Sequence, residues 1–556
     1  MSHINRVSIK NYRGIKYLSQ NFDKEKFIIL IGRGDSGKST ILSAIHAVLS
    51  PSWNLSFSDL DFYNQDTSES IEIEVEVSEL PSELLTTRKY GFYINNDINN
   101  NCKESDLSIT IRLTVDETLE PCWIVKARDN ADIDNKVISA QDRALIGANF
   151  ITDYTDNQFA YNKLSPLYTL TKATIGDSKP IDQIKSRLLR EMSQSVELTD
   201  MEVLRSPLSS LKNTAEKLGL AIDVLTPKID IKDNPYTGNS ITLHEDNLPY
   251  RLHGKGSKRL MSIAIQMNIA NQGGIALIDE IEQGLEPDRI VTLVRMFKRK
   301  TRGQVFITTH SMNVILEANA CNLFVLNKNN KALTHVDSDL DSCRRSNPQA
   351  FFGRKLIVCE GKTEQGFLRE MDKRIEEKYD ANFSTHGVVI VCAQGGNKMF
   401  TFANKLKGLG YDVCIFADND RSNELEKYIK QSTKNDIPLF LCQENKCLEQ
   451  DVFTSVSWTA VLRLALCNED IFDSTHINIP DEIKNCLIPN TPLNEQEELR
   501  TKISELSIKK NKEWFKNIPG GEFLGHVVFD DFDNLKENSI LKKNILGLIK
   551  WCNFGK

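Results

Sequence analysis

Short apolar runs, most of them followed closely by glycine or by acidic side chains, recur along the chain and predict buried strands. The first, at 27–31 (FIILI), is followed at 41–49 (ILSAIHAVL) by apolar side chains at helical spacing. Further runs of this kind occupy 275–278, 305–307, 355–359, 388–392 and 413–417. Strands that alternate with helices are typical of an α/β fold built on parallel sheets. We therefore expect the α/β fold class.

Two regions depart from this pattern. From 70 to 127, apolar and polar residues alternate with a period of two, as in SIEIEVEVSE, which predicts antiparallel strands and a β-rich lobe. Between 150 and 240, the apolar residues of IDQIKSRLL fall on one face of a predicted helix. We interpret 150–240 as a helical insertion, which is either a dimerisation arm or an extension of the core.

The segment between the first apolar run and the helix after it is rich in glycine. Gly32 and Gly37 let a loop turn its backbone N–H groups towards phosphate, and the N-terminus of the next helix favours the same negative charge. Lys38 would reach the β- and γ-phosphates, and the hydroxyl of Ser39 would hold Mg²⁺. The segment fits GxxxxGK[ST] in the strand–loop–helix context that a phosphate-binding loop requires. The residues predicted to bind ATP are Gly32, Arg33, Gly34, Asp35, Ser36, Gly37, Lys38, Ser39 and Thr40.

Three later motifs add candidate ATPase chemistry. Four apolar residues precede Asp279 and Glu280, so Asp279 is a candidate Mg²⁺ ligand and Glu280 is placed to polarise the attacking water. Another apolar run leads to His310, and the sequence HGKGS at 253–257 precedes a predicted helix. In this order, with the glycine loop upstream, these motifs resemble the ABC-type ATPase heads of SMC and RecF-like proteins over roughly residues 1–335.

The resemblance to an ABC/SMC-like ATPase head has further implications. It makes Gly254, Gly256 and Ser257 the signature that caps the nucleotide of a partner head, and His310 the switch histidine. It also implies that two heads sandwich two nucleotides, and so predicts a homodimer. The sequence departs from the family because HGKGS replaces the usual LSGGQ signature.

Two of the three apolar runs after residue 350 are followed directly by acidic side chains. Glu360 follows the first of them, and Asp418 and Asp420 follow the third, two residues apart, so both point to one side of an extended backbone. Because the carboxyl ends of parallel strands share one edge of a sheet, we expect these carboxylates to converge there. Carboxylates gathered in this way repel one another unless a cation neutralises them, and oxygen ligands suit Mg²⁺ or Mn²⁺. Glu364, about one helical turn beyond Glu360, is a candidate ligand for a second ion.

This acidic arrangement resembles a Toprim domain, and the order of head and Toprim domain resembles the OLD (overcoming lysogenisation defect) family of nucleases. The resemblance implies that Glu449 and Asp451 are further metal ligands and that a lysine near the C-terminus offsets transition-state charge. We favour Lys516 for that role, with Lys512 and Lys543 as alternatives, and we expect the basic stretch that includes Arg500 and Lys502 to contact DNA. The predicted catalytic residues are Glu360, Asp418, Asp420, Lys516 and Glu280, and the predicted metal ligands are Glu360, Glu364, Asp418, Asp420, Glu449, Asp451, Ser39 and Asp279.

The motifs divide the chain into five expected regions. These are the N-terminal part of the head at 1–149, the helical insertion at 150–240, the C-terminal part of the head at 241–340, the Toprim nuclease domain at 350–470, and a C-terminal extension that completes the Toprim site at 471–556. The polar stretch 327–349 is interpreted as the linker between head and Toprim domain.

Composition limits the partners and the compartment. The formal net charge is −7, from 69 Lys and Arg against 76 Asp and Glu, so binding of DNA requires local basic patches. The twelve cysteines show no zinc-ligand spacing, and several lie in apolar runs, as expected for buried thiols in a reducing compartment. With no signal peptide and no apolar run long enough for a membrane span, we expect a soluble, cytoplasmic protein without a membrane partner.

The sequence thus predicts an ATP-regulated, metal-dependent DNA endonuclease that hydrolyses phosphodiester bonds. The resemblance further implies an antiphage effector, as in Gabija nuclease subunits and retron-associated effectors, with a retron reverse transcriptase and its RNA–DNA product, or another defence subunit, as partner. The alternative is an ATP-driven clamp or scaffold whose Toprim domain binds DNA or a partner without cutting. Retention of the mutually repelling acids favours the nuclease, because a binding module has no need of them.

Overall fold

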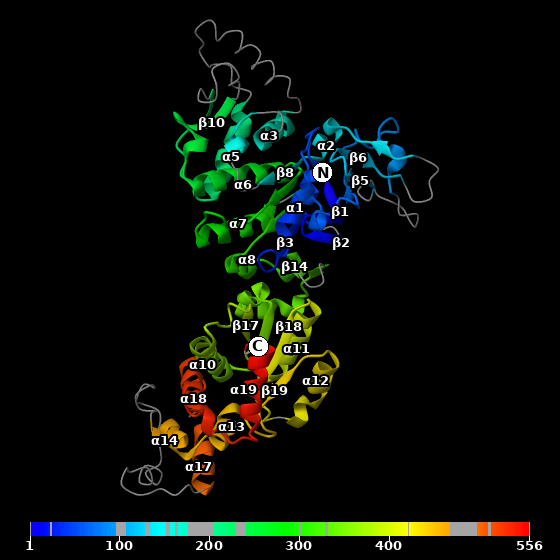
Figure 1. Ribbon diagram of the computed structural model, residues 1–556. Coiled ribbons are helices and arrows are strands. Elements are labelled where there is room, and N and C mark those ends of the chain that lie inside the picture. The colour runs from blue at the N-terminus through cyan, green and yellow to red at the C-terminus, as the bar shows by residue number, and fades with distance from the viewer. Residues whose placement is uncertain are drawn as a thin grey trace. The chain divides into compact units, whose positions relative to one another are not determined.

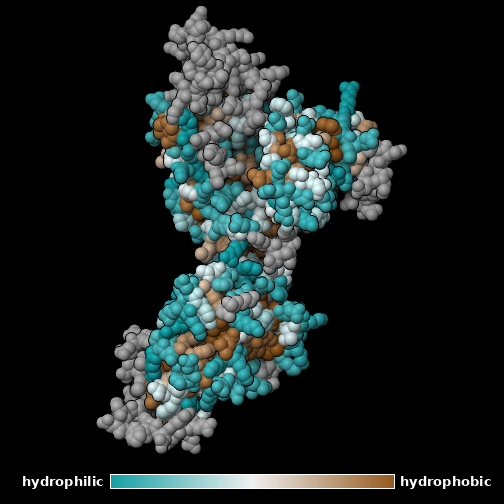
Figure 2. All heavy atoms as spheres, in the orientation of Figure 1, coloured by the Kyte–Doolittle hydropathy of each residue, from teal (hydrophilic) through white to brown (hydrophobic). Residues whose placement is uncertain are grey.

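The computed structural model describes residues 2–22, 25–95, 107–127, 134–151, 156–161, 165–175, 204–229, 241–300, 302–327, 332–420, 422–466, 497–509 and 513–554. The chain forms two compact units, Met1–Val336 and Asp337–Lys556 (Figure 1). The helix predicted at 181–189 and the candidate lysine Lys512 lie outside the described residues. Figure 2 shows hydrophilic side chains over most of the visible surface of each unit. Within the described residues, no helix has the length and apolar character needed to cross a membrane.

The first unit is built around a largely parallel sheet. Its strands, in spatial order, are β15 (Ala332–His335), β14 (Leu323–Asn327), β3 (Phe27–Ile31), β13 (Gln304–Thr308), β12 (Ile275–Ile278) and β8 (Ala148–Ile151). All pairings are parallel except that of β14 with β15. The loops that follow β3, β12 and β13 therefore leave the same edge of the sheet, which gathers the predicted ATPase motifs.

A second, antiparallel sheet forms the β-rich lobe. Its strands, in spatial order, are β2 (Ile15–Asn21), β1 (His3–Tyr12), β4 (Ile71–Ser78), β5 (Ser108–Val115), β6 (Pro121–Val125) and β7 (Lys136–Val137). A small third sheet has the order β11 (Leu248–Pro249), β10 (Ile241–Glu245) and β9 (Leu225–Ile229). The antiparallel strands expected between 70 and 127 are thus present among the described residues.

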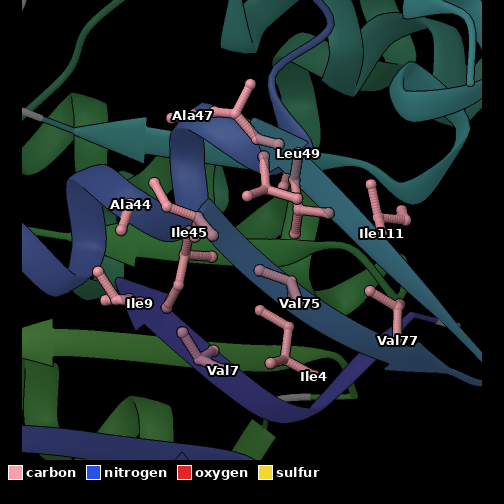
Figure 3. Close-up of a cluster of buried hydrophobic side chains, with 14 of the residues drawn as sticks. Ile4, Val7, Ile9, Ala44, Ile45, Ala47, Leu49, Val75, Val77 and Ile111 are labelled. Carbon is pink, nitrogen blue, oxygen red and sulfur yellow. The ribbon is translucent and has the colours of Figure 1, made fainter. Parts of the chain in front are cut away.

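Helix α1 lies between the parallel sheet and the β-rich lobe. It begins directly after the glycine loop, and Figure 3 shows its side chains Ala44, Ile45, Ala47 and Leu49 packed with apolar residues of β1, β4 and β5. Removal of these apolar side chains from water supplies the main free energy that joins the two sheets. The helices of this unit are α1 (Lys38–Leu49), α2 (Ala140–Ile146), α3 (Pro166–Ile175), α5 (Arg205–Lys217), α6 (Lys255–Asn271), α7 (Pro287–Lys300) and α8 (Met312–Glu317).

The second unit has an open, fully parallel sheet with helices on both faces (Figure 1). The strand order is β17 (Val388–Cys392), β16 (Lys355–Cys359), β18 (Asp412–Ala417) and β19 (Leu439–Leu441). The helices are α9 (Asp341–Ser346), α10 (Lys362–Tyr379), α11 (Gly396–Gly408), α12 (Ser422–Lys434), α13 (Leu448–Ser455), α14 (Trp458–Leu466), α17 (Glu497–Ser507), α18 (Ile518–Asp530) and α19 (Ile540–Trp551).

Helices α10 and α18 approach each other closely at two glycines. A Cβ atom on Gly521 would overlap the carbonyl oxygen of Thr363, and one on Gly366 would overlap that of Ile518. Only glycine fits at such a close helix contact. The contact fixes the start of α18, and with it the segment that carries Lys516, against the start of α10.

The boundary between the two compact units, Val336/Asp337, falls within the stretch 327–349 that was interpreted as a linker, although parts of this stretch are folded. Its described residues include β15, which pairs with β14, and α9, whose Arg344 is buried. The polar composition did not reveal β15, because a strand at the end of a sheet is held by backbone pairing and does not need a fully apolar sequence.

Candidate functional site

The glycine loop holds a buried ammonium group. Gly32 and Gly37 have φ values of 146° and 104°, and a Cβ on Gly32 would lie 2.7 Å from the carbonyl oxygen of Leu326. The Nζ atom of Lys38 donates hydrogen bonds to the carbonyl oxygens of Gly32 (2.9 Å) and Arg33 (3.1 Å). Burial lowers the pKa of Lys38 to about 8, although the carboxylate of Asp279 acts in the opposite direction. The loop residues Arg33, Gly34 and Asp35 are exposed, while Ser36, Gly37 and Thr40 are partly buried.

The predicted Mg²⁺ ligands of the ATPase site meet. The hydroxyl of Ser39 donates to Oδ1 of Asp279 (2.9 Å), and so does the hydroxyl of Thr308 (2.6 Å). Thr308 also accepts a hydrogen bond from the backbone N–H of Glu280 (2.8 Å). Strands β12 and β13 pair in register, which places these residues side by side at the edge of the sheet. A serine hydroxyl beside an aspartate is a ligand pair that suits Mg²⁺ bound to nucleotide.

Helix α6 connects the signature segment, 254–257, to the sheet edge where Asp279 and Glu280 lie. Gly254 caps α6, and Gly256 and Ser257 lie in its first turn. The buried Arg259, one turn further on, donates to the carbonyl oxygens of Asp279 and of Glu280 (2.8 Å to Glu280). Glu280 adopts a left-handed backbone conformation with φ of 46°, which turns the chain sharply after Asp279. Arg259 was not among the predicted residues, because its role depends on main-chain atoms that no sequence pattern reveals.

His310 lies within electrostatic range of the same site. Burial and the ammonium of Lys38 lower its pKa, against the opposing effect of Glu282 and Glu280. Its backbone N–H donates to Oε1 of Glu282, whose other oxygen accepts from the hydroxyl of Thr309 (2.7 Å). Glu282 is a second residue that sequence reasoning missed. Its proximity to Asp279 and Glu280 in the sequence was the available signal.

In the second unit, three carboxylates from different elements converge on one lysine. Asp418 follows β18, Glu364 lies in the first turn of α10, and Glu449 lies in the first turn of α13. All three are buried, with exposed fractions of 6%, 3% and 1%. Lys516 precedes α18, and its Nζ lies 3.8 Å from Oε1 of Glu449.

Burial and nearby carboxylates disfavour the charged forms of Glu364 and Asp418. Burial, with Glu449 and Glu360 nearby, raises the pKa of Glu364 to about 7, against the effect of its backbone hydrogen bond and of Lys516. Burial and the charges of Glu364 and Glu449 raise the pKa of Asp418 well above its usual range. For Lys516, burial favours the neutral form, but the carboxylates outweigh it and raise its pKa. The site therefore holds more carboxyl groups than one lysine can keep ionised, and a bound cation would favour their charged forms.

The buried hydroxyl of Thr363 links the parts of this acidic cluster. It donates to the carbonyl oxygen of Phe515 (2.9 Å) and lies 3.3 Å from Oε1 of Glu449. The second oxygen of Glu449, Oε2, is buried and has no hydrogen-bond partner. Clustered carboxyl groups whose ionisation a cation would favour, with one buried carboxylate oxygen that has no partner, fit a hard divalent cation. Thr363 was not predicted, and its place between the two predicted glutamates was the available signal.

The other predicted ligands lie apart from this cluster or at its rim. Glu360 is partly buried and acts on Glu364, whereas Asp420 is exposed. Burial raises the pKa of Asp451, but its Oδ2 accepts from the backbone N–H of Gln443 (3.3 Å), so this carboxylate is engaged elsewhere. Among the described residues, no three acidic, histidine or cysteine side chains lie close enough to form a ready-made metal site.

The expectation that Arg500 contacts DNA is wrong. Arg500 is buried, and its guanidinium donates to the carbonyl oxygens of Phe453 (2.6 Å) and Val456 (2.9 Å) at the end of α13. The last carbonyl groups of a helix have no partner within the helix and attract a cation. Arg500 therefore binds the end of α13 from inside the unit and does not lie on the surface.

The geometry defines a P-loop ATPase unit joined to a parallel α/β unit with an acidic site at its carboxyl edge. Residues 27–317 match the family described as "AAA domain, putative AbiEii toxin, Type IV TA system", and residues 351–420 match "Overcoming lysogenization defect protein-like, TOPRIM domain". Because the first match spans more than half of the 556 residues, the chain belongs to that AAA-domain family, and with its second domain it has the ATPase–Toprim architecture of the OLD family.

Solved structures with a similar fold include several distant likenesses, and no curated protein matches the chain. An SMC head bound to the C-terminal winged-helix domain of ScpA has a TM-score of 0.39 at 16% identity, covering 58% of this chain and 93% of that one. An SMC head with an extended coiled coil, bound to the C-terminal domain of ScpA derived from Pyrococcus furiosus, has a TM-score of 0.38 at 15% identity, with coverage of 59% and 94%. The recombination mediator RecF with ATP has a TM-score of 0.37 at 13% identity, with coverage of 60% and 98%. These scores are too low to carry an argument.

Proposed function

We propose that the protein is an ATP-regulated, divalent-metal-dependent DNA endonuclease that hydrolyses phosphodiester bonds at the acidic cluster of its second unit. The observation that carries this proposal is the convergence of Glu364, Asp418 and Glu449 on Lys516, with Oε2 of Glu449 buried and unpartnered. A domain that only bound DNA would gain nothing from carboxylates whose charges oppose one another.

The residues of the cluster have separable roles. Glu364, Asp418 and Glu449, with Glu360 and Asp420 at the rim, would hold Mg²⁺ or Mn²⁺, which would activate water and stabilise the leaving oxygen. The half-exposed ammonium of Lys516 would bind the phosphate and stabilise the charge that develops on it. Thr363 would hold Glu449 and the segment before α18 together. Asp451 is a weaker candidate because its carboxylate is engaged with Gln443.

We propose that the first unit hydrolyses ATP and thereby controls cutting. The loop from Gly32 to Thr40 would bind the phosphates, and Ser39 with Asp279 would hold Mg²⁺. Glu280 would polarise the attacking water, and His310 would contact the γ-phosphate. In a homodimer of heads, Gly254, Gly256 and Ser257 of one subunit would cap the nucleotide of the other.

The biological role rests on the OLD-type architecture. We propose an antiphage effector whose partners are DNA and a second copy of the chain, with a retron reverse transcriptase and its RNA–DNA product, or another defence subunit, as the activating partner. Co-purification of nucleic acid or protein with the tagged chain from its own host would test this part separately.

Cleavage of supercoiled plasmid and linear DNA tests the central proposal. The purified protein is incubated with Mg²⁺ or Mn²⁺, with and without ATP, beside Asp418→Ala and Lys38→Ala. Metal-dependent cutting that is absent in Asp418→Ala supports the nuclease, and the Lys38→Ala result shows whether nucleotide controls it. Undiminished cutting by Asp418→Ala would refute the site. ATP hydrolysis and DNA binding without cutting, even after addition of the partner, would favour the clamp or scaffold.

A further inference from the structure

One carboxylate fixes two consecutive residues of the switch loop. Oε2 of Glu282 accepts a hydrogen bond from the hydroxyl of Thr309 (2.7 Å), and Oε1 accepts one from the backbone N–H of His310. The hydroxyl of Thr309 in turn accepts from the backbone N–H of Ser311 (2.9 Å). Thr309 is completely buried, so its hydroxyl has no competing water on that side. Hydrogen bonds to a charged acceptor are stronger than neutral ones.

These bonds extend the pairing of β12 and β13 beyond the sheet. The backbone N–H of Glu280 donates to the hydroxyl of Thr308 (2.8 Å), and that of Ile281 donates to the carbonyl oxygen of Thr308 (3.2 Å). The turn after β12 is therefore bonded at successive positions to the segment after β13. This hydrogen-bonded segment runs from Asp279, which accepts a hydrogen bond from Ser39, to Glu282, which accepts one from the backbone of His310.

The hydrogen bonds of the Glu282 carboxylate bear on the position of the His310 imidazole. Glu282 bonds to the backbone of His310 and to its neighbour, while the side chain of His310 lies in the electrostatic field of Lys38, Asp279 and Glu280. A fixed backbone that keeps a side chain in the electrostatic field of the phosphate-binding lysine can hold a catalytic group ready, because little reorganisation remains for the reaction.

We propose that Glu282 is a positioning residue for ATP hydrolysis, which holds the switch loop so that His310 is aligned with the nucleotide. The proposal rests on the proposed ATPase function of this unit. Loss of the carboxylate releases Thr309 and the backbone of His310 together, while the glycine loop and Ser39 keep their own contacts. The rate of hydrolysis therefore depends on Glu282, and nucleotide affinity does not.

The first experiment measures steady-state ATP hydrolysis and the Kd of a fluorescent ATP analogue for the full-length protein and for Glu282→Ala. We expect kcat to fall by roughly 10- to 100-fold, the size of effect that slight misalignment of a catalytic group produces, with Kd changed by less than about threefold. Glu282→Gln keeps an acceptor for the N–H of His310 and recovers most of kcat. Glu286→Ala is the matched control, because the side chain of Glu286, just before α7, is 61% exposed and forms a surface ion pair with Arg289 (3.1 Å).

The second experiment separates positioning from general stability. In a His310→Ala background, Glu282→Ala should cost no further activity, because a residue that acts through His310 has nothing left to align. Thr309→Val removes one hydroxyl at nearly constant volume and should lower kcat in the same direction, and it provides a test if Glu282→Ala fails to fold.

The outcomes distinguish this inference from the function it rests on. If the wild-type protein hydrolyses no ATP, the proposed ATPase function fails. If the wild type is active but Glu282→Ala or Thr309→Val retains its kcat, or loses affinity instead, the positioning role fails. The role is also contradicted if Glu282→Ala lowers kcat as much in the His310→Ala background as in the wild type. A kcat of Glu282→Gln as low as that of Glu282→Ala contradicts it too.

Discussion

The Nζ atom of Lys516 lies 3.8 Å from Oε1 of Glu449, although Lys516 precedes α18 and Glu449 lies in the first turn of α13. The hydroxyl of Thr363, which reaches both Glu449 and the carbonyl group of Phe515, connects the two segments. The lysine thus stands among buried carboxylates rather than in a solvated basic stretch.

Replacement of Lys516 should abolish most cutting without loss of the fold. Lys516→Ala removes the cation that would face the scissile phosphate, and we expect DNA cleavage to fall by roughly 10²- to 10³-fold. Lys516→Arg should retain part of the activity, because it keeps the charge. Lys543→Ala, an exposed position on α19 that the sequence offered as an alternative, should cut like the wild type. Comparison of initial cleavage rates decides between the two lysines, and equal losses would contradict the assignment.

Neutralising Asp418 should stabilise the metal-free protein. Asp418→Asn keeps the acceptor for the backbone N–H of Leu448 (2.7 Å) but removes a carboxyl group whose ionisation burial, Glu364 and Glu449 oppose. We expect an equal or higher Tm in EDTA, together with loss of the increase in Tm that Mg²⁺ or Mn²⁺ gives the wild type. Asp412→Asn, at the other end of β18, should leave the metal-induced increase intact. Thermal unfolding with and without metal is the measurement, and a full metal response in Asp418→Asn would count against the site.

Adding a single methyl group at Gly521 should disrupt the start of α18. The Cβ would overlap the carbonyl oxygen of Thr363, so α10 and α18 must separate, at a cost of about 1–3 kcal/mol for overpacking. Cleavage should fall as well, because the same movement displaces Lys516. Gly408→Ala on α11 is the matched control: nothing lies within 4 Å of its added Cβ, and its effect should stay within about 1 kcal/mol. Urea unfolding of both variants tests the prediction, and equal stabilities would refute it.

His46 of α1, whose Nδ1 atom is buried, should make the first unit sensitive to mild acid. Burial lowers the pKa of His46 to about 4 from an ordinary value of 6.5, and its Nδ1 has no hydrogen-bond partner. Between these two values the unfolded chain binds a proton that the folded chain excludes. The free energy of unfolding therefore keeps its full value above about pH 6.5 and falls as the pH drops towards 4.

Replacing the ring by a side chain that cannot titrate should reduce that dependence. We expect Tm to fall less between pH 7 and about 5 in His46→Leu than in the wild type. His335→Gln, at an exposed position of the same unit, should keep the wild-type slope. An unchanged slope in His46→Leu would show that other groups cause the acid sensitivity.

The sequence by itself determined the main elements and most of the chemistry. Apolar runs of the right length marked β3, β12, β13, β16, β17 and β18, because a strand buried on both faces must be apolar throughout. The glycine loop could be predicted from the sequence because its geometry depends on residues that are neighbours in the chain. The acids after β16 and β18 were readable because parallel strands end at one edge.

Only the tertiary structure decided which charges meet. Sequence reasoning treated Asp451 and Glu449 alike and placed Arg500 on the surface, yet Glu449 faces Lys516, Asp451 bonds to Gln443, and Arg500 is buried beneath α13. These outcomes depend on the rotation of α13 and on the approach of α18 to α10, which packing between distant segments sets. Glu282 and Thr363 were missed for the same reason, since a hydrogen bond between residues far apart in the chain leaves no periodic pattern in the sequence.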